Sequence, residues 1–182
     1  MHEGKEIINI TMADGLSGTY QSAVGAAQIA EDSNITVINS KTLCGPHRYM
    51  VEKAALMEKQ GKSVSEIIEW LKCAAEKSES FLIPQDFSFL KRGGRLTPVA
   101  AAFGHMFKLK SIMTQTHDGK KLDKYAVKRT MKHAVMTLIE HMKEKGICEK
   151  HILYVSHANA YDDAKKIAEQ IKESFKVLMY IY

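Results

Sequence analysis

The stretch Glu6-Ile7-Ile8-Asn9-Ile10-Thr11-Met12, followed by Gly15-Leu16-Ser17-Gly18-Thr19-Tyr20-Gln21-Ser22-Ala23, decides the fold of this chain. The first segment is rich in β-branched residues and predicts a strand. Residues 20–31 predict a helix, and Ile35 to Asn39 predict a second short strand. Strand, glycine-containing turn, helix and strand together are typical of a parallel α/β unit.

The turn between the first strand and the helix has the composition of an anion site. The first turn of a helix has unpaired N–H donors, and the helix dipole adds roughly half a positive charge there. A carboxylate or phosphate is therefore favoured at this point. Gly15 and Gly18 are expected to allow positive φ and close approach of a ligand, while Ser17 and Thr19 add hydroxyl donors.

An ordinary helix cap is the alternative interpretation of the same turn. Serine or threonine before a helix usually caps it and binds nothing, contributing about 1 kcal/mol. The pattern lacks the lysine of a Walker loop and the third glycine of the dinucleotide fingerprint. From spacing alone, both interpretations stay open.

Composition places the chain among globular proteins of one large or two small domains, since it has 182 residues of which 45% are hydrophobic. No apolar run approaches the roughly 20 residues that span a bilayer, and the N-terminal residues lack the apolar core of a signal peptide. We therefore expect a cytoplasmic location. Cys44, Cys73 and Cys148 are widely spaced and predict reduced thiols, with neither disulfides nor a metal site.

The positive charge is concentrated in the middle of the chain. Residues 1–90 carry 8 Lys and Arg against 12 Asp and Glu, residues 91–150 carry 14 against 5, and residues 151–182 carry 4 against 4. A basic region of this kind can bind nucleic acid, bind an acidic protein, or simply be solvated. No helix-turn-helix, zinc or RNP signature accompanies it, so we expect no nucleic acid partner.

The first eighty residues predict more helices than a two-stranded sheet needs. Residues 48–60 form a predicted helix that ends at Gly61, and Ser63 to Glu66 is a capping-box pattern that opens another. A parallel sheet needs cover on both faces, yet only two strands are convincing here. Further strands must come from residues outside this sequence or from a partner, or the segment is less ordered.

The polar residues 77–80 mark a predicted boundary between a domain of residues 1–78 and one of residues 79–182. The second domain predicts an α+β fold with a mixed sheet covered by helices. Its expected strands are residues 81–83, 108–116, 120–127, 152–156 and 177–182, and its expected helices are residues 86–91, 96–107, 129–145 and 161–175. Lys91-Arg92-Gly93-Gly94-Arg95 is a basic turn whose paired glycines predict positive φ.

Two motifs, about seventy residues apart, give the chain a family resemblance. Leu16-Ser17-Gly18-Thr19-Tyr20-Gln21-Ser22-Ala23 and Phe89-Leu90-Lys91-Arg92-Gly93-Gly94-Arg95-Leu96 occur in this order, and the likeness continues through Val37 to Ser40 and Asp118 to Lys120. With these motifs the chain resembles the DegV family over essentially its whole length. The resemblance implies a parallel α/β domain followed by an α+β domain.

The resemblance also implies a function. Proteins of this family bind a long-chain fatty acid between the two domains, and some present it to a dihydroxyacetone-kinase-like fatty acid kinase. The serine of the family's Leu-Ser-Gly-Thr loop, which is Ser17 here, contacts the carboxylate, and Gly18 and Thr19 extend this site by physical argument. Lys91, Arg92 and Arg95 are then expected on the surface that meets the kinase.

An acyl tail needs an apolar slot, because burial contributes about 0.8 kcal/mol for each methylene. The expected wall residues near the domain junction are Phe103, Met106, Phe107, Leu109, Ile112 and Met113, although residues of these types are more often core. No cofactor is expected. Relative to the family pattern, the chain is expected to be truncated at both ends, and Asn39 replaces an aspartate.

An enzyme is the alternative to a non-catalytic lipid carrier. Ser17 would then be a nucleophile or phosphate binder of a hydrolase or phosphotransfer enzyme, with a histidine such as His157 as its base. The sequence lacks the Gly-X-Ser-X-Gly elbow of serine hydrolases. A carrier needs no such base, so the carrier is the leading hypothesis.

Overall fold

The computed structural model describes residues 5–30, 34–102, 109–116 and 120–182. The chain divides into two compact units, and each has its own hydrophobic core. Unit 1 comprises Met1–Ser80 with Gln115–Leu122, and unit 2 comprises Phe81–Thr114 with Asp123–Tyr182. The boundary near residue 78 between separately folding domains stays a prediction.

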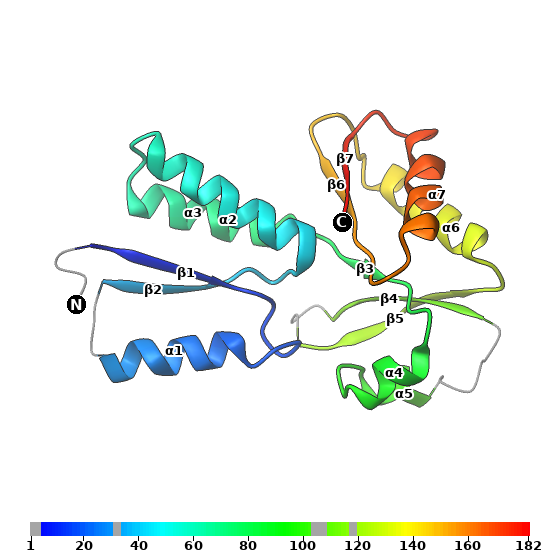
Figure 1. Cartoon of the computed structure of the whole chain (residues 1–182), viewed down its shortest axis with the longest axis horizontal. Helices are drawn as coiled ribbons and strands as arrows, with labels where there is room; N and C mark the ends of the chain where they lie inside the picture. The colour runs from blue at the N-terminus through cyan, green and yellow to red at the C-terminus, as the bar shows by residue number, and fades with distance from the viewer. Residues whose placement is uncertain (1–4, 31–33, 103–108, 117–119) are drawn as a thin grey trace. The chain divides into compact units, whose positions relative to one another are not determined.

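Unit 1 is built on a two-stranded parallel sheet. Strand β1 (Ile7–Thr11) pairs with β2 (Ile35–Asn39), and helix α1 (Thr19–Ala30) connects them. The register runs from Ile7 opposite Ile35 to Thr11 opposite Asn39. Within this unit α1 lies on one side of the strands and two further helices lie on the other (Figure 1). The parallel α/β unit that the sequence predicts is confirmed.

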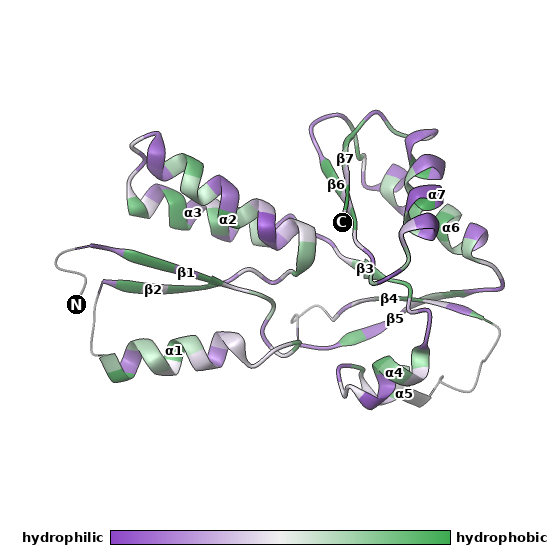
Figure 2. Ribbon diagram, in the orientation of Figure 1, coloured by the Kyte–Doolittle hydropathy of each residue, from purple (hydrophilic) through white to green (hydrophobic). Residues whose placement is uncertain are grey.

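The core of unit 1 lies between the sheet and helices α2 (Cys44–Lys59) and α3 (Val64–Glu76). Figure 2 shows β1 and β2 as largely hydrophobic and the two helices as alternately hydrophobic and hydrophilic. The alternation is the pattern of a helix with one buried face. The buried members of this core are Ile38, Met50, Ala54, Met57, Ile67, Leu71 and Ala75.

Helix α2 begins four residues earlier than the sequence predicts. Its first residue is Cys44, so Pro46 lies in the first turn, where a missing N–H removes no helical hydrogen bond. The C-terminus is as predicted: Gly61 has φ +75°, and the N–H of Lys62 donates to the carbonyl of Met57 over 3.0 Å. This is the geometry by which a glycine just beyond a helix satisfies its last carbonyls.

Helix α3 has the reciprocal cap that its sequence predicts. The Ser63 hydroxyl accepts from the N–H of Glu66, and the Glu66 carboxylate accepts from the N–H of Ser63 at 2.9 Å. Lys62 Nζ lies 2.8 Å from the same carboxylate. The hydrogen bond from Lys62, followed by those from Ser63, lowers the pKa of Glu66 from 4.5 to about 2.

Glu66→Ala is expected to destabilise the chain at neutral pH, and the loss should disappear in acid. Because the pKa of Glu66 is lower in the folded state, its stabilising contribution is full above pH 4.5 and is lost as the pH falls towards about 2. Urea unfolding across this range measures the difference. Glu69→Ala, on the same exposed helix surface but outside the cap, should show no such pH dependence.

Unit 2 contains two sheets among its described residues, except that Gln115 and Leu122, at the ends of two strands of the first sheet, belong to unit 1. In the first, the strand order is β3 (Phe81–Leu82), β4 (Lys110–Gln115) and β5 (Leu122–Lys128), with β3 and β4 antiparallel. The short helices α4 (Phe87–Arg92) and α5 (Pro98–Ala102) precede β4. Asp86 caps α4 by accepting from the N–H groups of Ser88 and Phe89.

The second sheet of unit 2 is a parallel pair covered by two helices. Strand β6 (Ile152–Val155) pairs with β7 (Leu178–Ile181), and α6 (Met131–Glu144) and α7 (Tyr161–Lys172) pack on it. The buried members of this core are Val135, Ile139 and Ile171. Parallel and antiparallel pairs with covering helices confirm the predicted mixed α/β fold class. No helix of the described residues has the length and hydrophobicity to cross a membrane.

Candidate functional site

The turn after β1 brings the predicted anion-site residues together. Gly15 has φ +80°, and residues Asp14 and Ser17 form an isolated β-bridge across the turn. A Cβ at Gly15 would lie 2.6 Å from the Cα and the carbonyl oxygen of Lys120, which belongs to the same unit. Leu16 is buried and anchors the turn from within. A side chain at position 15 would therefore require the backbone around Lys120 to move.

Gly18 differs from Gly15 and from the prediction for it. Its φ is not positive, so the prediction of a left-handed glycine is wrong at this position. Its carbonyl accepts the first helical hydrogen bond of α1, from the N–H of Ser22 at 3.0 Å, which makes Gly18 the N-cap residue. A Cβ at Gly18 would meet none of the described residues within 4 Å, so the described structure leaves the space at this residue open.

The two residues next to Gly18 in the chain are linked through their hydroxyl groups. Ser17 Oγ lies 2.5 Å from Thr19 Oγ1 and accepts from the N–H of Thr19 at 3.3 Å. Ser17 is half-buried, whereas Thr19 is exposed. Ser17 therefore caps one N–H of α1, as the ordinary-cap interpretation predicts.

Other N–H donors at the start of α1 are not capped by the described protein. The backbone N–H groups of Tyr20 and Gln21 donate to no residue that the structure describes. Together with the hydroxyls of Ser17 and Thr19, they form a group of donors at the positive end of a twelve-residue helix. This arrangement favours a bound anion.

Sequence reasoning did not identify the side chains that fasten the turn. Gln21 Nε2 donates to Asp14 Oδ2 at 3.0 Å, which ties the turn to α1. Asn39 Oδ1, at the end of β2, accepts from the N–H of Asp14 at 3.3 Å and from that of Lys41 at 2.9 Å. The only sequence signal was the position of Asn39 at the end of a predicted strand, where parallel sheets hold their ligands.

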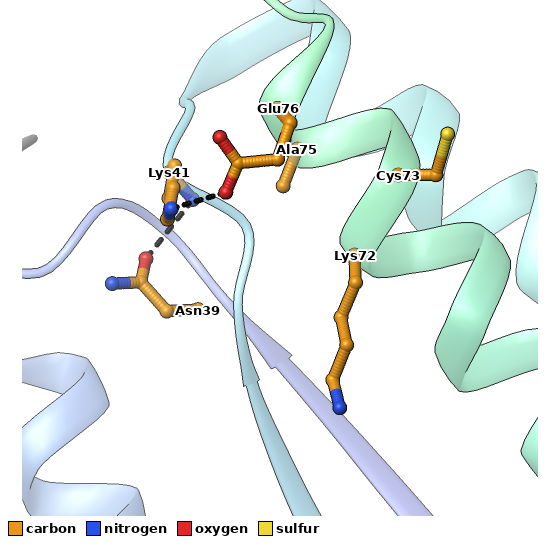
Figure 3. A pocket seen from close by; sticks show the side chains of 6 residues that line it. All are labelled: Asn39, Lys41, Lys72, Cys73, Ala75 and Glu76. Carbon is orange, nitrogen blue, oxygen red and sulfur yellow. Dashed lines mark hydrogen bonds and ion pairs between the residues drawn. The ribbon is translucent and has the colours of Figure 1, made fainter.

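A small pocket of about 370 Å³ lies at this same end of β2. Figure 3 shows its lining side chains, with Asn39 turned towards the backbone of Lys41 and the Lys41 ammonium directed at Glu76. Lys41 Nζ and Glu76 Oε1 are 2.5 Å apart, so this ammonium group is already paired. The lining residues are Asn39, Lys41, Lys72, Cys73, Ala75 and Glu76.

Ser17 is not paired with a base within the described structure. Its hydroxyl contacts only Thr19 among the described residues. His157, named as a base for the enzyme alternative, belongs to unit 2, where its Nδ1 accepts from the N–H of Ala160 at 3.2 Å. The described residues contain no group of three or more His, Cys, Asp or Glu side chains that could hold a metal ion.

The predicted docking residues lie at the end of α4. Lys91 and Arg92 are exposed in its last turn, and Arg95 Nη1 donates back to the Gly93 carbonyl at 2.5 Å. Of the paired glycines, Gly94 has φ +71° whereas Gly93 has φ −66°. Positive φ is thus confirmed at one of the two positions.

The predicted tail-binding residues are only partly covered by the structure. Ile112 and Met113 are buried in unit 2, and Leu109 is half-buried. Their contact with a ligand stays a prediction. Phe103, Met106 and Phe107 lie outside the described residues.

Comparison with known proteins identifies the family. The family described as "Uncharacterised protein, DegV family" matches residues 1–181. A DegV domain-containing protein of Clostridium acetobutylicum is 34% identical over 189 residues, covering 96% of this chain and 62% of the relative. A DegV domain-containing protein of Staphylococcus aureus strain N315 is 32% identical over 179 residues, covering 98% of this chain and 63% of the relative. The chain thus spans less than two thirds of the length of these relatives.

Solved structures of the same family have a similar fold. A DegV family protein from Eubacterium eligens, loaded with heptadecanoic acid, matches with a TM-score of 0.84 and 25% identity over 100% of this chain and 67% of that protein. DegV, a fatty acid binding protein from Bacillus subtilis, matches with a TM-score of 0.78 and 29% identity. The match covers 97% of this chain and 63% of that protein.

Fold and turn geometry together define an α/β protein with hydrogen-bond donors gathered at the start of one helix. The family model that matches residues 1–181 shows which family of α/β proteins this is. The chain belongs to the DegV family.

Proposed function

We propose that this chain binds a long-chain fatty acid and holds its carboxylate at Ser17, Gly18 and Thr19. The observation that carries the proposal is the group of uncapped N–H donors at the start of α1, beside two hydroxyls and an open glycine. Relatives support it, since the Eubacterium eligens structure is loaded with heptadecanoic acid and the Bacillus subtilis protein is a fatty acid binding protein.

The head group and the tail make different contributions to this binding. Donors at a helix start fix the position of a carboxylate and compensate part of its lost hydration. The tail supplies most of the affinity, at about 0.8 kcal/mol for each buried methylene. We propose that Phe103, Met106, Phe107 and Ile112 contact the tail.

The same site favours a carrier over an enzyme. A serine nucleophile needs a base within hydrogen-bond reach, and the hydroxyl of Ser17 contacts only Thr19 among the described residues. Capture and release of a lipid require no such base. A hydrolase or phosphotransfer enzyme using Ser17 is therefore the less favoured alternative, and the carrier needs no cofactor.

A fatty acid kinase is the partner we propose, with docking at Lys91, Arg92 and Arg95. These cations gather at one helix end beside Phe89, whose side chain is 72% exposed. Exposed cations around an aromatic side chain suit an acidic protein surface with an apolar centre. The cytoplasmic location and the lack of a nucleic acid partner stay predictions.

Ser17→Ala should weaken fatty acid binding without unfolding the chain. A hydrogen bond to a charged group contributes about 1.5–3 kcal/mol, so we expect roughly tenfold or greater weakening. Calorimetric titration of delipidated protein with hexadecanoic acid measures the affinity, and mass spectrometry measures copurified lipid.

Ser65→Ala is the matched control, because Ser65 is exposed on α3 of the same unit and makes no described side-chain hydrogen bond. It should bind like the wild type. Equal affinities of Ser17→Ala and wild type would contradict the head-group role of Ser17. Ester or phosphoester turnover that vanishes in Ser17→Ala would favour the enzyme instead.

A further inference from the structure

We propose that the side-chain amide of Gln115 is a further hydrogen-bond donor to the head group of the bound lipid, an inference that rests on the proposed function. Gln115 is the last residue of β4. Its Nε2 atom is buried, and it is the one buried side-chain nitrogen or oxygen in the described ranges that lacks a hydrogen-bond partner.

A buried donor without an acceptor is unfavourable. An amide that leaves water gives up its hydrogen bonds to water, and the loss is recovered only where a new acceptor replaces them. Most buried polar groups in proteins therefore have a partner, and an exception calls for a water molecule, an ion or a functional role. An oxygen atom of a bound ligand would satisfy the Gln115 amide.

Gln115 begins the segment of unit 2's sheet that belongs to unit 1. Residues 115–122 group with unit 1, as does the turn between β1 and α1. The two parts of unit 1 are in contact, because the backbone of Lys120 packs against Gly15 of the turn. The segment that starts at Gln115 therefore adjoins the turn where we place the carboxylate.

Hydrogen bonds fix this segment next to Gln115. The N–H of Thr116 donates to the carbonyl of Lys121 at 2.9 Å, and the N–H of Lys121 donates to the Thr116 hydroxyl at 3.1 Å. Thr116 follows Gln115, and Lys121 follows the residue that packs on Gly15. The backbone of Gln115 is thus ordered before a ligand binds, so binding has little ordering cost there.

The chemistry of the amide suits a carboxylate. Nε2 of a glutamine has two N–H donors, and an ionised carboxylate has only acceptors. A hydrogen bond to a charged acceptor is stronger than one to a neutral acceptor. An unpaired amide therefore destabilises the ligand-free protein, whereas the same amide strengthens the complex once the carboxylate is bound.

Gln115→Met tests this role, because methionine has nearly the length and flexibility of glutamine and has no amide. We expect two effects of opposite sign. The midpoint temperature of unfolding of the delipidated protein should rise by about 2–4 °C, since an unpaired buried donor is removed. The affinity for hexadecanoic acid in a calorimetric titration should fall about tenfold, since the carboxylate loses a donor.

Gln28→Met is the matched control. The side chain of Gln28 also forms no hydrogen bond with the described residues, but it is exposed on α1, where water satisfies its amide. This variant should keep both the midpoint temperature and the affinity of the wild type.

The results that would overturn the role of Gln115 differ from the one that would overturn the proposed function. A lower midpoint temperature in Gln115→Met would mean that the amide already has a partner within the protein. Wild-type affinity in this variant would mean that water, not the lipid, satisfies the amide. Either result overturns this inference and leaves the proposed function in place. If the wild type does not bind hexadecanoic acid, the proposed function is overturned, and this inference with it.

Discussion

Gly15→Ala should lower the free energy of unfolding by about 2–4 kcal/mol. Two causes add at this position. Gly15 has φ +80°, a conformation that costs an L-residue about 1–3 kcal/mol. The added methyl group would also lie 2.6 Å from the backbone of Lys120, so the segment around Lys120 must move. The midpoint temperature of thermal unfolding should fall by about 5–10 °C in a chain of this length.

Gly61→Ala is the control that separates the two causes. Gly61 has φ +75°, nearly the same as Gly15, but a Cβ there would meet no described residue within 4 Å. Its substitution should show the cost of the backbone conformation alone, about 1–3 kcal/mol, and therefore a smaller loss than Gly15→Ala. Equal losses in the two variants would show that the contact between the turn and Lys120 is absent in solution.

Local features of unit 1 were predictable because each depends on a few adjacent residues. The cap at Ser63 and Glu66 and the positive φ of Gly61 follow from side chains within one helical turn. The contact of Gly15 with Lys120 could not be predicted, since more than one hundred residues separate the two. The early start of α2 was missed because glycine and proline at positions 45 and 46 are typical of turns.

In the candidate site, too, the features set by adjacent residues were predictable and the contacts between distant residues were not. Ser17 and Thr19 follow from the strand, turn and helix order, and the structure places their hydroxyls in contact. The supporting role of Asn39 joins the ends of two strands and has no local signature. Two uses were predicted for Gly18, a left-handed backbone and room for a ligand; the first is wrong, and the second stays a prediction.

The second of these uses leads to the prediction with the largest expected effect on binding. Gly18→Val should weaken fatty acid binding strongly while leaving the fold intact. The φ of Gly18 is one that a side chain can adopt, and the added atoms would meet nothing in the described protein. They would instead occupy the open space at Gly18, next to Ser17 and Thr19 in the chain, where we place the carboxylate.

Forcing extra methyl groups into a filled site costs about 1–3 kcal/mol, which corresponds to roughly five- to 150-fold weaker binding. Gly25→Val is the matched control, because Gly25 lies on the same helix, also faces open space, and is remote from the turn. Titration with hexadecanoic acid should show weaker binding for Gly18→Val alone, and thermal unfolding should show that both variants are folded. Wild-type affinity in Gly18→Val would mean that no head group enters this turn, because a ligand held there cannot share its space with an isopropyl group.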